Sequence, residues 1–164
     1  MARSALGSLP QFVVASATQG SADAFVTTRI ETGISTAARY AWMIDRVEFF
    51  LALGSIDAWA NADSSFEAQI TQGSAPAAIV AATSTDFICC RRLYKAADGT
   101  PASAQFVAPD LTWSAPENLV VVDPSLNLNV DSTATAVANV VVARIWYWPV
   151  ELSEMDILRM LALR

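Results

Sequence analysis

Short runs of hydrophobic and β-branched residues recur along the chain, separated by clusters of Gly, Pro, Ser, Asp and Asn. This pattern is typical of many short β-strands rather than of alternating strands and helices. In some runs, such as Ser65 to Thr71, hydrophobic and polar residues alternate, which predicts a strand with one face in water. We predict a mainly β protein of about eight strands, within residues 11–17, 24–30, 40–53, 65–71, 86–94, 104–107, 118–122, 126–130 and 136–150.

The end of the chain has the signals of one short helix, over residues 153–163. Ser153 is a suitable N-cap, and the acidic Glu154 and Asp156 fall in the first turn, near the positive end of the helix dipole. At 164 residues the chain has the size of one domain. We therefore expect an N-terminal arm (1–10), one antiparallel β-sandwich domain (11–150) and a C-terminal helix (151–164).

Two of the predicted strands are hydrophobic on both faces. In the run 140–148, Val141, Ala143, Ile145 and Tyr147 alternate with Val140, Val142, Trp146 and Trp148. In the run 40–53, strict alternation places Met43, Asp45, Val47, Phe49 and Leu51 on one face and Trp42, Ile44, Arg46, Glu48 and Phe50 on the other. A sheet in an isolated soluble domain normally leaves one face polar, and one short helix is too small to cover both strands. We expect contacts between subunits, with Trp42, Phe50, Trp146 and Trp148 as candidate interface residues.

The composition agrees with a protein that buries much apolar surface. Hydrophobic residues make up 54% of the chain and charged residues only 16%, and the mean hydropathy is +0.37. A disordered chain or a coiled coil would carry far more charge. Alanine-rich, weakly charged segments such as 75–78 suit close packing between copies. No uncharged stretch stays apolar for the 18 or more residues that a membrane span needs.

The residue types for most enzyme sites are missing. The chain has no histidine, which excludes the common triads and histidine metal sites. Its two cysteines, Cys89 and Cys90, are adjacent, which fits neither a disulfide framework nor a metal site. The carboxylates of Asp45 and Glu48 flank Arg46, which gives them ordinary ion-pairing roles. We predict no enzymatic activity, no catalytic residues and no cofactor or metal.

The charge of the chain argues against general nucleic-acid binding. The net charge is −6, which repels phosphate backbones unless the few cations are concentrated. Arg91, Arg92 and Lys95 form one local basic cluster that could hold a phosphate. We favour the alternative, in which these cations pair with acidic groups of a neighbouring strand or subunit.

A group of polar residues lies at alternate positions near the end of the predicted sandwich. Asn127, Asn129 and Asp131 fall on the same face of an extended strand. Their oxygens could share an ion, but a face exposed to solvent is the commoner arrangement, and we expect it here.

The strand pattern and the closing stretches Asn118-Leu-Val-Val-Val-Asp-Pro and Val140-Val-Val-Ala-Arg-Ile-Trp-Tyr resemble the single jelly-roll coat proteins of tailless icosahedral viruses. This resemblance implies two four-stranded sheets packed face to face and many identical copies in the shell of a virion, with or without a second capsid protein. Many such coat proteins gather their genome with a basic arm, whereas residues 1–10 hold one Arg and no Lys. Direct contact with the genome is therefore doubtful.

The main alternative is a carbohydrate- or ligand-binding β-sandwich. Exposed tryptophans could stack on sugar rings, the candidates being Trp42, Trp59, Trp113, Trp146 and Trp148. Such a module should be monomeric with an aromatic platform, whereas a shell subunit should associate with its own copies.

Overall fold

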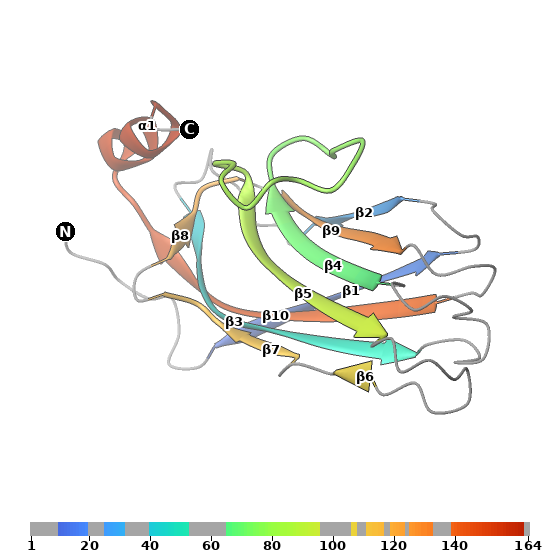
Figure 1. The fold of residues 1–164 in the computed structure, drawn as a ribbon. Helices are drawn as coiled ribbons and strands as arrows, with labels where there is room; N and C mark the ends of the chain where they lie inside the picture. The colour runs from blue at the N-terminus through green and yellow to red at the C-terminus, as the bar shows by residue number, and fades with distance from the viewer. Residues whose placement is uncertain are drawn as a thin grey trace.

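The structure is a computed structural model, and it describes residues 10–19, 25–31, 40–52, 65–95, 106–107, 111–116, 119–123, 125–132 and 139–162. The described part of the chain forms ten strands and one helix (Figure 1). They are β1 (Gln11–Gln19), β2 (Val26–Glu31), β3 (Tyr40–Ala52), β4 (Ser65–Gln72), β5 (Phe87–Lys95), β6 (Phe106–Val107), β7 (Thr112–Ser114), β8 (Val120–Val121), β9 (Ser125–Ser132), β10 (Asn139–Glu151) and α1 (Glu154–Ala162). The predicted arm, residues 1–10, lies outside the described residues except for Pro10.

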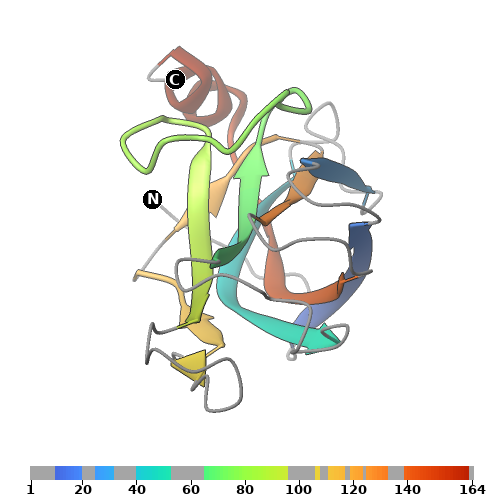
Figure 2. The ribbon, with the colours of Figure 1, turned by 45° about the vertical axis from the view of Figure 1, so that its right-hand side comes forward.

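The strands form two antiparallel sheets that pack face to face as a β-sandwich (Figure 2). Sheet I has the order β1-β10-β3-β7, and β8 pairs with the other end of β3. Sheet II has the order β2-β9-β4-β5-β6. Seven of the described strands have six residues or more, and β6, β7 and β8 have only two or three. The predicted antiparallel β-sandwich with a short C-terminal helix is confirmed.

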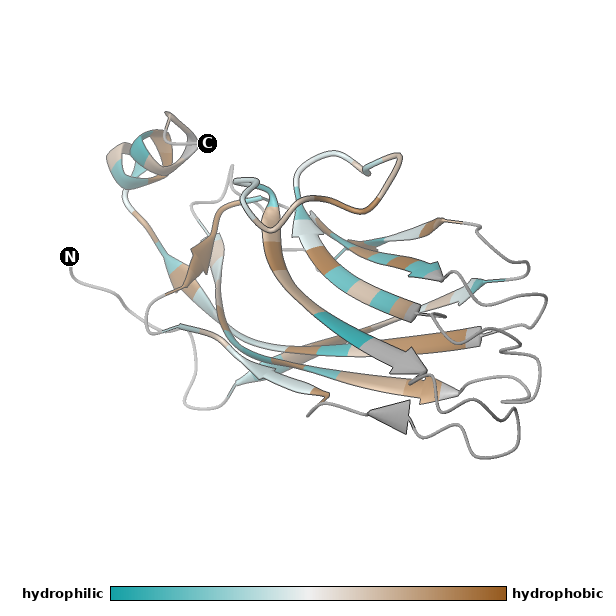
Figure 3. Cartoon of the chain, viewed as in Figure 1, coloured by the Kyte–Doolittle hydropathy of each residue, from teal (hydrophilic) through white to brown (hydrophobic). Residues whose placement is uncertain are grey.

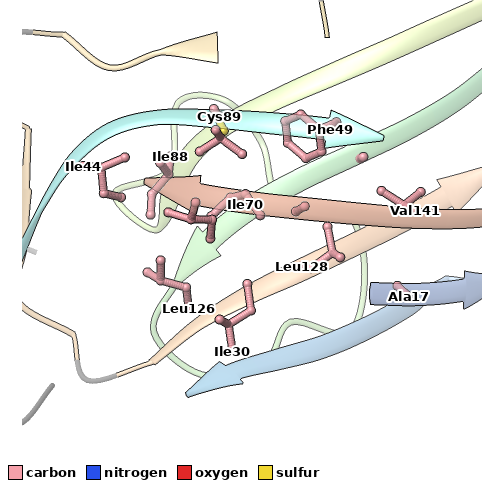
Figure 4. Close-up of a cluster of buried hydrophobic side chains, with 14 of the residues drawn as sticks. Ala17, Ile30, Ile44, Phe49, Ile70, Ile88, Cys89, Leu126, Leu128 and Val141 are labelled. Carbon is pink, nitrogen blue, oxygen red and sulfur yellow. The ribbon is translucent and has the colours of Figure 1, made fainter. Parts of the chain in front are cut away.

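The core lies between the sheets and is built from alternate residues of the long strands. Sheet II contributes side chains such as Ile70 and Leu128, and sheet I contributes Phe49 and Val141 (Figure 4). Hydrophobic and polar residues alternate along β4 and β9 (Figure 3), as the pleat of a strand requires. On β10, the predicted alternation is confirmed, and the side with Val141, Ala143, Ile145 and Tyr147 faces the core, because all four are buried.

The pairing of β3 with β10 contains one irregularity that determines which side chains reach the surface. Trp146 pairs with Arg46 but Tyr147 pairs with Ile44, so Asp45 has no partner on β10. One extra residue in a strand reverses the side to which the following side chains point. The core therefore receives side chains from both parts of β3. Trp42 and Ile44 come before the β-bulge in the chain, and Val47 and Phe49 come after it. The strict alternation predicted for 40–53 is corrected here: Trp42 and Ile44 do not share a face with Arg46, Glu48 and Phe50.

Helix α1 begins and is capped as predicted. The backbone N–H of Asp156 donates to Ser153 Oγ at 3.2 Å, and Ser153 Oγ donates to Asp156 Oδ2 at 2.8 Å. The helix lies at one end of the sandwich, near β8 (Figures 1 and 2). Ile157 packs there in a second hydrophobic cluster with Ala41, Val122, Val150 and Leu152. Among the described residues, no helix is long and apolar enough to cross a membrane.

Candidate interaction surface

The outer face of sheet I carries exposed aromatic side chains where β1, β10 and β3 lie side by side. Among the described residues of this sheet, Phe12, Val14 and Phe50 are the exposed large hydrophobic side chains, at 54%, 50% and 47% exposure. Strand pairing aligns Phe12 with Trp146, and Phe50 with Val142. We call the following group the aromatic face: Phe12, Val14, Arg46, Glu48, Phe50, Arg144 and Trp146.

Glu48 is the centre of the polar contacts on the aromatic face. Its carboxylate accepts hydrogen bonds from Trp146 Nε1 at 3.0 Å and Arg46 Nε at 3.1 Å, and Arg144 Nη1 lies at 3.5 Å. The hydrogen bond from the Trp146 indole is the main cause that lowers the pKa of Glu48, and the bond from Arg46 acts in the same direction. The hydrogen bond to Glu48 raises the pKa of Arg46 in turn. Glu48 is therefore charged at neutral pH.

The guanidinium groups of the aromatic face stack on its rings. Arg46 Cζ lies 4.4 Å from the centroid of the Trp146 ring, and Arg144 Cζ lies 5.5 Å from Phe12 and 5.2 Å from Phe50. The rings of Phe12 and Trp146 are 5.0 Å apart and tilted by 47°. Each cation–π contact at an exposed site contributes about 0.5–1 kcal/mol. The contacts hold the rings in place where no other described part of the chain covers them.

The charges on the aromatic face are paired within the chain. Arg46 also binds Asp45, with Nη1 at 2.8 Å from Oδ2. Arg46 and Arg144 supply two positive charges, and Asp45 and Glu48 supply two negative ones. A partner can cover such a neutral surface without having to supply a compensating charge, which lowers the cost of removing its water. Trp, Phe and Arg are also the residue types enriched in protein–protein interfaces.

The four candidate interface residues lie in three different environments. Phe50 and Trp146 belong to the aromatic face. Trp148 is half-buried and packs against the second hydrophobic cluster, beside α1. Trp42 is 0% exposed, its ring lies 4.6 Å from that of Tyr147, and its Nε1 donates to the carbonyl oxygen of Asp123 at 2.8 Å. Trp42 is therefore a core residue, and its assignment to an interface is corrected.

Two members of the predicted basic cluster, Arg91 and Arg92, make separate contacts within the chain. Arg91 Nη2 donates to the carbonyl oxygen of Thr112 at 2.7 Å, which links β5 of sheet II to β7 of sheet I. Arg92 pairs with Glu67, with Nε at 2.7 Å from Oε2. The alternative of pairing with an acidic group on a neighbouring strand is thus confirmed for Arg92. The side chain of Lys95 lies outside the described residues, so this part of the prediction stays a prediction.

The outer face of sheet II is polar, and its central part on β9 and β4 is buried. Asn127 and Asn129 are 0% exposed, and the face predicted to be solvated is corrected. Asn129 Oδ1 accepts from Thr27 Oγ1 at 2.8 Å, and Asn129 Nδ2 donates to Thr71 Oγ1 at 2.9 Å, so one amide joins β2, β9 and β4. Glu67, Gln69 and Thr71 on β4, which the alternation placed in water, are buried as well.

The loop between β4 and β5, residues 73–86, provides part of this cover. Gly73, with a φ of 87°, turns the chain back after β4 in a conformation that favours glycine. The carboxamide of Gln69 pairs with both backbone groups of Val80, accepting from its N–H at 3.0 Å and donating to its carbonyl at 2.9 Å. The carbonyl of Gly73 accepts from Asn127 Nδ2 at 3.2 Å. The loop thus supplies hydrogen bonds that water would otherwise make.

A pocket of about 350 Å³ lies between this loop and sheet II. Glu67, Gln69, Cys90 and Arg92 line it, together with hydrophobic residues of the loop. Burial is the main cause that raises the pKa of the Cys90 thiol, and it raises that of Cys89 further. Both thiols are therefore protonated at neutral pH and are poor nucleophiles. The described residues contain no group of three or more Cys, Asp or Glu side chains that could hold a metal ion.

Five of the seven members of the aromatic face were not among the predicted interface residues: Phe12, Val14, Arg46, Glu48 and Arg144. The test that identified two-sided strands would have found the first two, since Phe12 and Val14 alternate with Val13 and Ala15. The ion pair of Glu48 with Arg46 was predicted, but its contacts with Trp146 and Arg144 depend on the pairing of β3 with β10. No protein-family model matches the chain, and no curated protein is significantly similar to it.

Proposed function

We propose that this protein is a structural subunit that assembles with its own copies, through the aromatic face of sheet I, into a capsid or a similar shell. The observation that carries the proposal is that Phe12, Val14 and Phe50 are exposed together on the outer face of sheet I, around the guanidinium of Arg144. Exposed apolar groups gathered on one face mark interaction sites. The paired charges of Arg46, Glu48 and Arg144 make this surface suited to burial against protein.

The strand order supports the same function. In sheet I the first strand, β1, lies beside the last strand, β10, and in sheet II β2 lies beside β9. Each sheet therefore pairs an early strand of the chain with a late one. A nested, double-sheet order of this kind characterises the jelly roll, an architecture found in viral capsid and lectin domains. Since one fold serves many functions, the aromatic face and not the fold decides between them.

The test is to compare the particle size of the wild-type chain with that of the variant Phe50→Asp. We expect defined oligomers or large particles from the wild type in light scattering and negative-stain electron microscopy. Phe50→Asp should be a folded monomer, because it replaces an exposed apolar ring by a carboxylate that would have to lose its water in the contact. Thr83→Asp adds the same charge to an exposed position of the loop over sheet II and should assemble normally. A wild-type chain that stays monomeric at high micromolar concentration would contradict the proposal.

A second candidate is a ligand-binding module, which the pocket between sheet II and the loop 73–86 favours. Its apolar lining beside Glu67 and Arg92 suits a small amphiphilic ligand. Stacking of a sugar on Trp146 is less favoured, because Arg46 and Phe12 already contact this ring. A monomeric wild-type protein that binds such a ligand would favour this second function.

A further inference from the structure

The described residues expose large hydrophobic side chains in two places. One is the aromatic face, and the other is helix α1, where Met155 and Leu158 are 60% and 55% exposed. Residues three apart lie on the same side of a helix, so these two side chains form one exposed stripe. The protein thus presents one aromatic surface and one aliphatic surface.

The two surfaces belong to different parts of the molecule. The inward side of α1 is fixed on its own sandwich, because Ile157 and Met160 pack in the second hydrophobic cluster. That cluster uses Val150, which lies four residues beyond Trp146 on β10, or roughly 13 Å along the strand. Met155 and Leu158 point away from this contact and are left to meet another molecule.

The chemistry of the two surfaces is complementary. Methionine is flexible, and its thioether packs favourably against the edges of aromatic rings. An amphipathic helix that lays an apolar stripe on a partner is a common mode of recognition. The exposed Glu154, next to Met155 in sequence, adds a carboxylate that can approach Arg144, whose contact with Glu48 is the longest ion pair of the aromatic face at 3.5 Å. A second copy of the chain therefore carries the segment that fits the aromatic face.

We propose that helix α1 of one copy docks, through Met155 and Leu158, on the aromatic face of the next copy. This inference rests on the proposed function and names the partner of the same surface. A contact between two identical faces would close at two copies, whereas a head-to-tail pair keeps one free face on one copy and one free helix on the other. Such a contact can continue from copy to copy, as a ring or shell requires.

Two assembly-deficient variants test this contact by complementation. Phe50→Asp damages the aromatic face and keeps the helix, and Leu158→Asp damages the helix and keeps the face. We expect each variant alone to be a folded monomer of 17.5 kDa by circular dichroism and sedimentation velocity. An equimolar mixture at high micromolar concentration should form a 1:1 complex of about twice that mass, because only one helix and one face in it are intact.

Matched controls separate this inference from the proposed function. The first control mixes the double variant Phe50→Asp/Leu158→Asp with Leu158→Asp. This mixture contains no intact helix and should give no complex. In the second control, the conservative variant Leu158→Met should assemble like the wild type. If Leu158→Asp alone still associates, or if the two monomeric variants do not combine, the docking of α1 is wrong while assembly through the aromatic face stands. If the wild-type chain is itself monomeric, both proposals fail.

Discussion

The outer faces of the two sheets are opposite in both chemistry and exposure. The outer face of sheet I exposes aromatic side chains, among them Phe12 and Phe50, whereas that of sheet II buries polar ones, among them Gln69 and Asn129. A simple β-sandwich exposes polar residues on both outer faces. Each face here departs from that expectation, and each departure has a different cause.

The difference lies in what covers each face within one chain. Sheet II has the loop 73–86, which is fixed by the pairing of Gln69 with Val80. Sheet I has α1 at one end, where Trp148 is half-buried, and the part around Trp146 and Phe50 has no such cover among the described residues. A polar face that a loop already covers gains little from a partner, whereas an exposed apolar face gains stability when another molecule covers it. In the proposed function, the outer face of sheet II serves stability and that of sheet I serves association.

The largest loss in the free energy of unfolding is expected when Asn129, on the outer face of sheet II, is replaced. Asn129→Ala removes two hydrogen bonds and leaves the buried hydroxyl of Thr71 without this donor. We expect the free energy of unfolding to fall by about 2–3 kcal/mol. Urea unfolding followed by fluorescence measures this change, and the monomeric background Phe50→Asp separates it from assembly.

Ser16→Ala is the control for this measurement, since it removes a polar group from an exposed position on the outer face of sheet I. Its effect should stay within about 0.5 kcal/mol. Equal effects of Asn129→Ala and Ser16→Ala would contradict the contrast between the two faces.

A smaller loss in the free energy of unfolding is expected when Gln69 is replaced, and the change in structure should be confined to the loop 73–86. Gln69→Ala removes both hydrogen bonds to Val80, but these backbone groups can turn to water when the loop opens. We expect a loss of about 1–2 kcal/mol in the free energy of unfolding, with faster amide hydrogen exchange at Val80.

Gln72→Ala is the matched control, because Gln72 Nε2 also donates to this loop, to the carbonyl of Thr85 at 2.7 Å, but in an exposed position. If exchange at Val80 rises as much in Gln72→Ala as in Gln69→Ala, the buried pairing does not hold the loop.

Most of the fold followed from the sequence, because it depends on local patterns. The alternation in residues 65–71 and 126–130, and the capping signals at Ser153, predicted strands and a helix that the structure confirms. Of the three short strands, β6 and β8 lie within the predicted runs 104–107 and 118–122, whereas β7 was not predicted. Strand β7 depends on its pairing with β3, and its own three residues carry little signal.

The two outer faces were harder to predict, since each depends on contacts between distant residues. Alternation shows that Asn127 and Asn129 share a face, but it does not show that a loop some 50 residues earlier meets that face. Alternation also fails at Trp42, where the bulge at Asp45 reverses the direction of the side chains. The bulge does not affect Phe50, which keeps the face that alternation gave it together with Arg46 and Glu48, the outer face of sheet I.

The smallest expected change in the free energy of unfolding comes from protonating Glu48, the carboxylate at the centre of the aromatic face. The folded structure lowers the pKa of Glu48 below its ordinary value of 4.5, so its contribution to stability is complete above that value. The contribution is lost as the pH falls through the lowered pKa, when the carboxylate is protonated and its bonds to Trp146 and Arg46 weaken. We expect a change of under about 1 kcal/mol, as for other surface ion pairs.

The indole N–H of Trp146 reports this titration directly, because it donates to Glu48. In the Phe50→Asp background, its NMR resonance should move with an apparent pKa below 4.5, and Trp146→Phe assigns the signal. In Glu48→Gln the same resonance should show no such transition, although a carboxamide oxygen still accepts the hydrogen bond. An indole signal that titrates equally in both proteins would mean that Glu48 does not organise the aromatic face, which would then rest on ring stacking alone.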